Sequence, residues 1–354
     1  MINSLRLQNF RSYKNDSFEF EAGVNIVVGP NTSGKTNLLE AILVLAEGAS
    51  YRARDADLIQ FNKPWARLDG LFSPNAARVV KLQRDDHQLV KQFVLAGKVY
   101  KRLSLEQSLP AVIFEPGHLQ LLARGPDYRR EFLDDLLARS QVGFKRVVNS
   151  YRRALTQRNA LLKRPKNQAA AQLFAWDVRL SDLAGQIVSA RLGLVEQINK
   201  TISKTYSQIA GRRASVRLDY QNQFGPEHYS SRMLAKLETS AELDFRRGFT
   251  GLGPHREDFT VYLNKQPALS SASRGETRSL VVALKIYELG LIKKARQATP
   301  IFLLDDVFSE LDSARRRALV DHLKGQQTII TTTDADAVIE YFTGEHRLIA
   351  LNRG

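Results

Sequence analysis

Cysteine is absent from this 354-residue chain, which rules out a disulfide framework and any zinc site built on thiolates. Long apolar runs are also missing, since no stretch approaches the roughly 18 residues of a membrane-spanning helix. The first residues, MINSLRLQNFRSYKND, lack the apolar core of a secretion signal. We therefore expect a soluble, cytoplasmic protein.

Acidic residues are few relative to basic ones: 37 Asp and Glu face 52 Lys and Arg, for a net charge of +15. An excess of this size favours polyanionic partners such as nucleic acid or anionic lipid, without identifying one. The 43% hydrophobic content is sufficient for one large domain or two lobes.

A phosphate-binding loop lies near the N-terminus, where GPNTSGKT (29–36) fits G-x-x-x-x-G-K-[ST]. The strand-like run VNIVV (24–28) precedes it, and a run with helical apolar spacing (37–43) follows it. Backbone N–H groups of such a loop and the helix N-terminus bind phosphate. A glycine-rich turn without a ligand is the structural alternative.

The expected roles within this segment differ by residue type. Lys35 would reach the β- and γ-phosphates as a catalytic cation, and the Thr36 hydroxyl would bind Mg²⁺. The expected ATP-binding residues are Gly29, Pro30, Asn31, Thr32, Ser33, Gly34, Lys35, Thr36 and Asn37.

A second element, PIFLLDDVFSELD, occupies residues 300–312. Its apolar run predicts a central strand buried on both faces, with Asp305 and Asp306 at the carboxyl edge, where open α/β sheets carry their chemistry. We expect Asp305 to hold Mg²⁺ through its hydration shell and Asp306 to orient or deprotonate the attacking water as the catalytic group. For Asp306 alone, a helix N-cap is the alternative. About 265 residues separate this element from the loop, which predicts a large insertion between them.

A third element begins an amphipathic stretch: Ser273-Arg274-Gly275-Glu276 resembles the S-x-G-[GEQ] signature of ABC-type ATPases. In that class the signature acts in trans, closing over the γ-phosphate held by a second subunit. The resemblance therefore implies an ATP-dependent, head-to-tail homodimer in which Ser273, Gly275 and Glu276 contact the partner's ATP.

Taken together, these motifs resemble the bacterial RecF family of recombinational repair ATPases, which are related to SMC heads. Four further segments match that family: LRLQNFRSY (5–13), GPDYRREFLD (125–134), GPHREDF (253–259) and the FSELD end of the aspartate element, with 309–312 at the dimer seam. Two features depart from the ABC pattern. Thr333 stands where many ABC ATPases place a switch histidine, and no Q-loop glutamine can be identified.

The resemblance implies an α/β fold: an ABC/SMC-like P-loop ATPase head built from residues 1–114 and 246–354, with a mainly helical lobe, 115–245, inserted. It also implies binding to DNA that requires ATP and Mg²⁺, at gaps and single-strand/double-strand junctions. The dimer would dissociate on slow hydrolysis and would help RecO and RecR load RecA during repair and replication restart.

Whether the chain is an enzyme stays open at this point. A weak, DNA-stimulated ATPase switch is one possibility. A DNA-binding module that does not hydrolyse ATP is another, because Asp306 stands in place of the more usual glutamate. A transporter motor subunit is a third, which the basic helical lobe disfavours. ATP turnover measured with and without DNA separates the three.

A basic segment lies inside the insertion, with nine cations and no acid between Arg139 and Lys166. On a helix several of these cations share one side. The DNA-binding candidates are Lys145, Arg146, Arg152 and Arg153, with Lys163 and Arg164 on the same side. Such contacts would be phosphate-directed, non-specific and salt-sensitive, and a solvated basic face is an equally good interpretation.

Three other segments are informative, and the last two of them allow two interpretations each. Apolar residues three or four apart over 173–202 predict an amphipathic helix that packs on its neighbours and is too short for an SMC coiled coil. Tyr51, Arg52 and Arg54 would contact phosphate or form ion pairs. His255 and Arg256 would sense nucleotide or form a structural turn.

Overall fold

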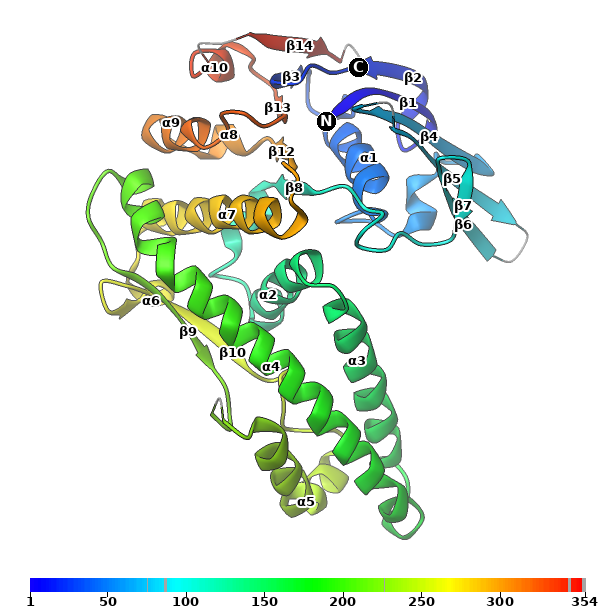
Figure 1. The fold of residues 1–354 in the computed structure, drawn as a ribbon, viewed down its shortest axis with the longest axis vertical. Helices are drawn as coiled ribbons and strands as arrows, with labels where there is room; N and C mark the ends of the chain where they lie inside the picture. The colour runs from blue at the N-terminus through cyan, green and yellow to red at the C-terminus, as the bar shows by residue number, and fades with distance from the viewer. Residues whose placement is uncertain (75, 86–87, 226, 343–344, 352–354) are drawn as a thin grey trace. The chain divides into compact units, whose positions relative to one another are not determined.

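The computed structural model describes residues 1–74, 76–85, 88–225, 227–342 and 345–351. The chain divides into two compact units (Figure 1). The head unit comprises residues 1–118 and 288–354, and the inserted unit comprises residues 119–287. The inserted unit therefore extends well beyond the boundary that we placed at residue 245, because the strand that follows this boundary pairs with a strand from inside the insertion.

A five-stranded parallel sheet forms the centre of the head unit. Its strands are Val24–Val28 (β3), Ala111–Phe114 (β8), Ile301–Asp305 (β12), Thr328–Thr332 (β13) and His346–Ala350 (β14). They lie in the order β14-β3-β13-β12-β8. The two apolar runs of the sequence, β3 and β12, thus flank β13 and end at the same edge, about 10 Å apart at the usual strand spacing.

The head unit also contains a six-stranded antiparallel sheet. Its strands are Ile2–Phe10 (β1), Tyr13–Glu19 (β2), Trp65–Phe72 (β4), Ala76–Asp85 (β5), Gln88–Leu95 (β6) and Lys98–Tyr100 (β7). They lie in the order β2-β1-β4-β5-β6-β7.

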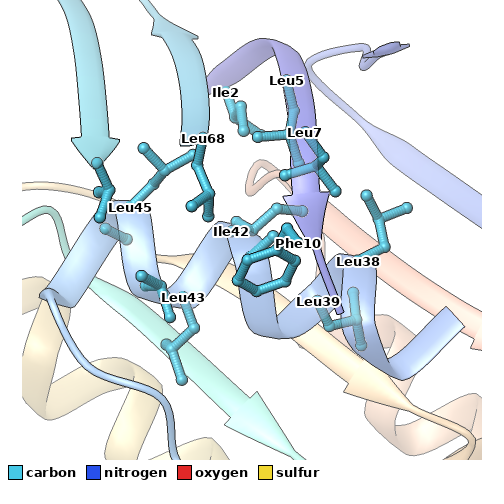
Figure 2. Close-up of a cluster of buried hydrophobic side chains, with 14 of the residues drawn as sticks. Ile2, Leu5, Leu7, Phe10, Leu38, Leu39, Ile42, Leu43, Leu45 and Leu68 are labelled. Atoms are coloured by element: carbon cyan, nitrogen blue, oxygen red, sulfur yellow. The ribbon is translucent and has the colours of Figure 1, made fainter. Parts of the chain in front are cut away.

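One helix, Lys35–Glu47 (α1), supplies much of the core of the head unit. Leucine and isoleucine side chains of α1 interdigitate with those of β1 and β4, as Figure 2 shows for Ile42, Leu45 and Leu68. Full burial of each such side chain stabilises the fold by about 1.5–3 kcal/mol. This packing fixes α1, and with it the loop that precedes α1, relative to the sheets.

Shorter helices complete the head unit. They are Asp55–Leu58 (η1), Val307–Glu310 (α8), Ser313–Asp321 (α9) and Asp336–Ile339 (α10). The turn Pro116–Gln120 (η2) and the helix Arg274–Arg296 (α7) each pass from one unit into the other.

The inserted unit is mainly helical. Its helices are Pro126–Ser140 (α2), Phe144–Leu161 (α3), Lys166–Ala210 (α4), Tyr229–Arg247 (α5) and Ala268–Ser271 (α6). A small antiparallel sheet of Val216–Gln221 (β9), Asp258–Leu263 (β10) and Gln266–Pro267 (β11) has the order β11-β10-β9. The predicted amphipathic helix is present, but at 45 residues and about 68 Å α4 is longer than its apolar stripe indicated.

A buried polar network stabilises the inserted unit. Arg158 is fully buried and donates hydrogen bonds to Asp177, Asp244 and Thr250. Breaking one partner of such a buried set costs about 3–5 kcal/mol. Arg158, one of the nine cations of the basic segment, therefore has a structural role and is not part of an exposed surface.

The helices give no indication of a membrane span. Over the described residues, none combines the length and the hydropathy that crossing a bilayer requires.

Candidate nucleotide site and basic surface

The glycine-rich loop connects β3 to α1, and its geometry depends on Gly34. The backbone there is left-handed, with φ 101°, and the Tyr13 hydroxyl donates to the Gly34 carbonyl at 3.0 Å. A Cβ at residue 34 would lie 2.9 Å from Ser12 Oγ, so only glycine fits. Within the described residues α1 has neither a side-chain cap nor an acid in its first turn. Its first N–H groups are therefore available to an anion.

Lys35 is held inside this loop. Its Nζ donates to the carbonyl oxygens of Gly29 (2.7 Å) and Pro30 (2.8 Å). Burial lowers the pKa of Lys35, against the opposing effect of Asp306 and Asp305. The ammonium group is thus desolvated and positioned by the loop, where a bound phosphate would compete for it.

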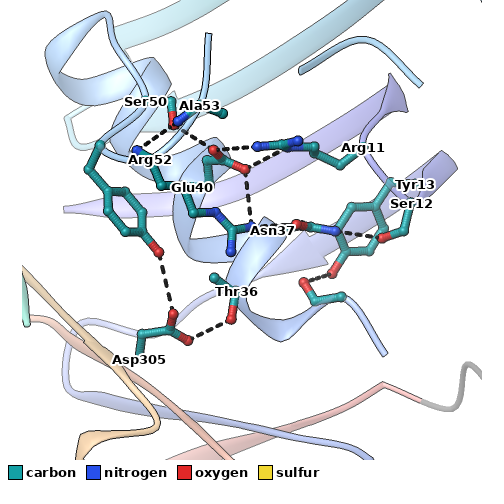
Figure 3. Close-up of polar contacts among 12 residues, drawn as sticks. Arg11, Ser12, Tyr13, Thr36, Asn37, Glu40, Ser50, Arg52, Ala53 and Asp305 are labelled. Atoms are coloured by element: carbon teal, nitrogen blue, oxygen red, sulfur yellow. Dashed lines mark hydrogen bonds and ion pairs between the residues drawn. The ribbon is translucent and has the colours of Figure 1, made fainter. Parts of the chain in front are cut away.

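The two expected Mg²⁺ ligands are in direct contact although 269 residues separate them. Thr36 Oγ1 donates to Asp305 Oδ1 at 2.9 Å. Thr331 donates to the same oxygen at 2.9 Å. The Tyr51 hydroxyl donates to Oδ2 at 3.3 Å, and Figure 3 shows this contact together with that of Thr36. A hydroxyl and a carboxylate beside a phosphate loop fit Mg²⁺, which takes few protein oxygens and completes its shell with phosphate and water.

Asp306 occupies a different environment from its neighbour. Its backbone is left-handed (φ 52°), it precedes α8, and its N–H donates to Thr331 Oγ1 at 3.0 Å. Burial raises the pKa of Asp306, partly offset by Lys35. In the described structure its carboxylate does not cap α8, which argues against a purely structural N-cap. A carboxylate of raised basicity next to the phosphate loop suits general-base chemistry.

A buried acid organises the other side of the loop, and the sequence analysis did not identify it. Glu40 on α1 is fully buried and accepts hydrogen bonds from Arg11, Arg52 and Ser50 (Figure 3). Burial raises the pKa of Glu40, but these hydrogen bonds outweigh burial and hold the pKa below its usual value. The signal available in the sequence was a lone acid inside the apolar run of α1.

This network also accounts for the segment after α1. Arg52 bonds to Glu40 and donates to Asn37 Oδ1 at 2.6 Å, which matches the ion-pair interpretation. Tyr51 contacts Asp305, so the segment links α1 to the aspartate edge. Arg54 is exposed.

The signature segment begins α7 in the inserted unit. The Ser273 N–H donates to Glu276 Oε2 at 2.7 Å, and the Glu276 N–H donates to Ser273 Oγ at 3.2 Å, which together form a capping box. Hydrogen bonds from Ser273, then Arg212, lower the pKa of Glu276. Gly275 follows in the first turn. The expected contact of Ser273, Gly275 and Glu276 with the ATP of a second subunit stays a prediction.

Strand β13 contains a functional candidate that was not predicted from the sequence, Thr331. Thr333, at the position of the switch histidine, is exposed, whereas Thr331 bonds to both Asp305 and Asp306. Further along the aspartate element, Ser309 Oγ donates to the Asp306 carbonyl, and Asp312 caps α9 by accepting from the Arg315 N–H.

The four DNA-binding candidates all lie on α3 and are exposed. Their side chains form no hydrogen bond or ion pair with any part of the chain that the structure describes. The other exposed positions of α3 carry no acid: they are Asn149, Thr156, Gln157 and Ala160. Since α3 ends at Leu161, Lys163 and Arg164 lie in the following turn, so the expectation that they continue the helical face is wrong.

The GPHRED segment is part of a dense buried network. The Tyr151 hydroxyl lies 2.7 Å from His255 Nδ1, and Glu257 accepts from the hydroxyls of Tyr220 and Tyr229. Burial lowers the pKa of His255 to about 4. The Arg256 guanidinium stacks over Phe249 at 5.1 Å. These contacts support the structural-turn interpretation over nucleotide sensing.

Comparison with known proteins agrees with this architecture. Residues 1–348 match the family described as RecF/RecN/SMC N terminal domain. The SMC head domain of Pyrococcus furiosus shares the fold, with a TM-score of 0.52, 17% identity, and coverage of 96% of this chain and 91% of that one. The fold is that of an ABC/SMC-like P-loop ATPase head.

Relatives of higher sequence identity show which family within the ABC/SMC-like class the chain belongs to. The RecF protein of Heliobacterium modesticaldum is 34% identical over 95% of this chain and 93% of its own length, and that of Moorella thermoacetica is 34% identical over 100% and 95%. The structure of "the recombination mediator protein RecF-ATPrS in RecFOR pathway" superposes with a TM-score of 0.85 and 28% identity over 96% of this chain and 94% of that one. The chain belongs to the RecF family.

Proposed function

We propose that this protein is an ATP-dependent DNA-binding switch of recombinational repair and replication restart. The observation that carries the proposal is the direct contact between Thr36 and Asp305, which joins the phosphate loop to the aspartate edge. Relatives of similar length are named DNA replication and repair proteins, and related structures are of RecF with ATP.

The ATP site that we propose is formed by residues 29–37 of the head unit. Gly29 and Gly34 allow the loop to turn, Lys35 binds the β- and γ-phosphates, and Thr36 with Asp305 holds Mg²⁺. Asp306 orients the attacking water, and its raised pKa suits a group that accepts a proton during a slow hydrolytic step. ATP would join two subunits when the partner's Ser273 closes over the γ-phosphate, and hydrolysis would separate them.

DNA binding is assigned to the exposed α3 face, where four cations have no ion-pair partner in the described structure. Gaps and single-strand/double-strand junctions are the proposed substrates, and RecO and RecR the proposed partners in loading RecA in the cytoplasm. The support for these partners is that the related structures belong to the RecFOR pathway.

The decisive experiment measures ATP turnover with and without duplex DNA, for the parent and for two variants of the loop and the aspartate edge. Lys35→Met should abolish ATP-driven dimerisation, because the γ-phosphate loses its main cation. Asp306→Asn should retain ATP and Mg²⁺ but turn over at least about tenfold more slowly and give a longer-lived dimer.

Three outcomes would contradict separate parts of the proposed function. Normal dimerisation of Lys35→Met in light scattering would refute the phosphate-loop assignment. Normal hydrolysis by Asp306→Asn would show that another group orients the water. A parent that binds DNA with ATP but shows no turnover would favour the non-hydrolysing DNA-binding module.

A further inference from the structure

The inserted unit has a shallow hollow, wide open to solvent and about 670 Å³ in volume, between the α3–α4 turn and the C-terminal end of α5. We refer to it as the turn hollow. Its rim carries Lys163, Arg164, Arg246 and Arg247, and the apolar side chains of Leu162 and Phe245 also line it.

The charges around the turn hollow are not balanced. The only acid among its lining residues is Glu242, which forms a salt bridge with Lys166 and also attracts Arg246, so one carboxylate faces five cations. The four rim cations are exposed, and none of the described residues offers their side chains a hydrogen bond or a salt bridge. Like charges gathered around a concave surface concentrate anions there. The turn hollow is therefore suited to a ligand with more than one negative charge.

The start of α4 adds to this preference. This 45-residue helix begins at Lys166, beside the turn hollow, and Pro165 stands at its N-cap. Of the described residues, no side chain caps it and no acid lies in its first turn. The Gln168 N–H donates to the Pro165 carbonyl, and the N–H groups before it together with the positive end of the helix dipole reinforce the cationic rim.

The apolar lining indicates that the ligand is more than an inorganic anion. Leu162 is 2% exposed and belongs to the small core beneath the turn hollow, whereas Phe245 packs against that core, is only partly buried and lines the turn hollow. A hollow of this volume, lined by cations and an aromatic ring, can bind a nucleotide unit, with its phosphate on the cations and its base against the ring. Within a duplex the bases are stacked and paired, so an unpaired strand is the form of DNA that offers such a base.

We propose that the turn hollow binds an unpaired DNA strand, with its phosphates on the four rim cations and a base against Phe245. This inference rests on the proposed function, because it takes DNA as the ligand. It assigns different forms of DNA to two surfaces of the inserted unit. The α3 face binds the phosphates of a duplex, and the turn that follows α3 binds the adjoining single strand.

The test compares three proteins by fluorescence anisotropy of labelled DNA in the presence of ATP. The turn variant changes all four rim cations to Gln, and its fold should survive because these side chains are exposed and form no hydrogen bond or salt bridge with the described residues. Circular dichroism checks this. The control variant removes as many exposed cations from the head unit and carries Lys81→Gln, Lys98→Gln, Lys101→Gln and Arg102→Gln.

We expect the turn variant to bind single-stranded oligo-dT at least about tenfold more weakly than the parent and the control variant. The slope of log affinity against log salt should fall by about 0.7 for each phosphate that the variant no longer binds. Binding to a blunt duplex should be unchanged. Replacing the oligonucleotide by one with abasic sites should weaken binding to the parent by several-fold, because the stacked base is removed.

The outcomes separate this inference from the proposed function. If the turn variant binds oligo-dT as tightly as the parent does, the inference is wrong while the proposed function stands. A parent that binds no form of DNA overturns both. If free thymidine monophosphate displaces the strand at micromolar concentration, the turn hollow is a free-nucleotide site and the strand assignment fails.

Discussion

Asp305 and Asp306 are adjacent in the sequence, yet their surroundings suit them to different tasks. Asp305 accepts hydrogen bonds from three hydroxyls, those of Thr36, Thr331 and Tyr51, and is 6% exposed. Asp306 itself has left-handed backbone geometry, and burial raises its pKa. One carboxylate is thus preorganised for a metal, and the other is suited to exchange a proton.

His255 supplies a prediction at the same scale. Burial holds its pKa at about 4, against 6.5 for a free histidine. Between these two values the unfolded chain binds a proton that the folded chain does not. The free energy of unfolding therefore falls as the pH drops from about 6.5 to 4, and His255 has no such effect above this window.

Replacing His255 by Gln removes this titration and retains a hydrogen-bonding partner for Tyr151. Between pH 7 and pH 5 the parent should lose about 2 kcal/mol more stability than His255→Gln. Urea unfolding followed by the fluorescence of Trp176, in a Trp65→Phe background, measures the difference. Equal losses in the two proteins would show that His255 is not held neutral by burial.

At the scale of elements, local sequence patterns predicted the positions of helices and strands. They did not predict the side-chain contacts between these elements. The loop, α1 and β12 follow from apolar periodicity and glycine spacing. The Glu40 network does not follow, because Arg11 and Ser50 reach it through tertiary packing. The end of α3 was missed because the basic pattern continues past Leu161 into the turn, and charge alone does not indicate where a helix stops.

The signature helix gives a prediction for an element. Ser273 caps α7 through its capping box with Glu276, and we propose that its exposed end also meets the γ-phosphate of a second subunit. Ser273→Arg should leave ATP binding to the mutated subunit intact and abolish ATP-driven pairing. Part of the effect would come from removing the cap, worth about 1 kcal/mol.

Ser273→Thr is the matched control, because threonine retains the capping hydroxyl without the bulk and charge of arginine. It should pair nearly as well as the parent in light scattering. Loss of ATP binding by the arginine variant would contradict a role in trans, as would normal pairing.

At the scale of the whole molecule, the phosphate loop, the signature and the aspartate element were sufficient to predict the family. The boundaries of the two compact units depend on tertiary packing, which the motifs do not indicate. The inserted unit includes β10, β11 and the start of α7, because β10 pairs with β9. Both strands alternate buried and more exposed residues, but the pairing joins residues about forty positions apart, and alternation within a strand does not indicate which strand it pairs with. The length of α4 was underestimated for a related reason, since its ends carry fewer apolar residues than its centre.

The last prediction concerns how the molecule as a whole holds duplex DNA. Lys145, Arg146, Arg152 and Arg153 form an exposed cationic face on α3 without acids among them. Changing all four to Gln preserves helix propensity, so the fold should persist. For each phosphate that the variant no longer binds, the slope of log affinity against log salt should fall by about 0.9 on duplex DNA, and equally for unrelated sequences.

A salt titration with ATP present measures these slopes for the parent, the α3 variant and the control variant of the head unit. ATP-driven dimerisation of the α3 variant should match the parent, because α3 contains none of the ATP-site residues. A slope that falls equally in the control variant would mean that net charge alone governs binding. An unchanged slope in the α3 variant would leave α3 a solvated face and place the duplex elsewhere, with Arg54, exposed after α1, as the next candidate.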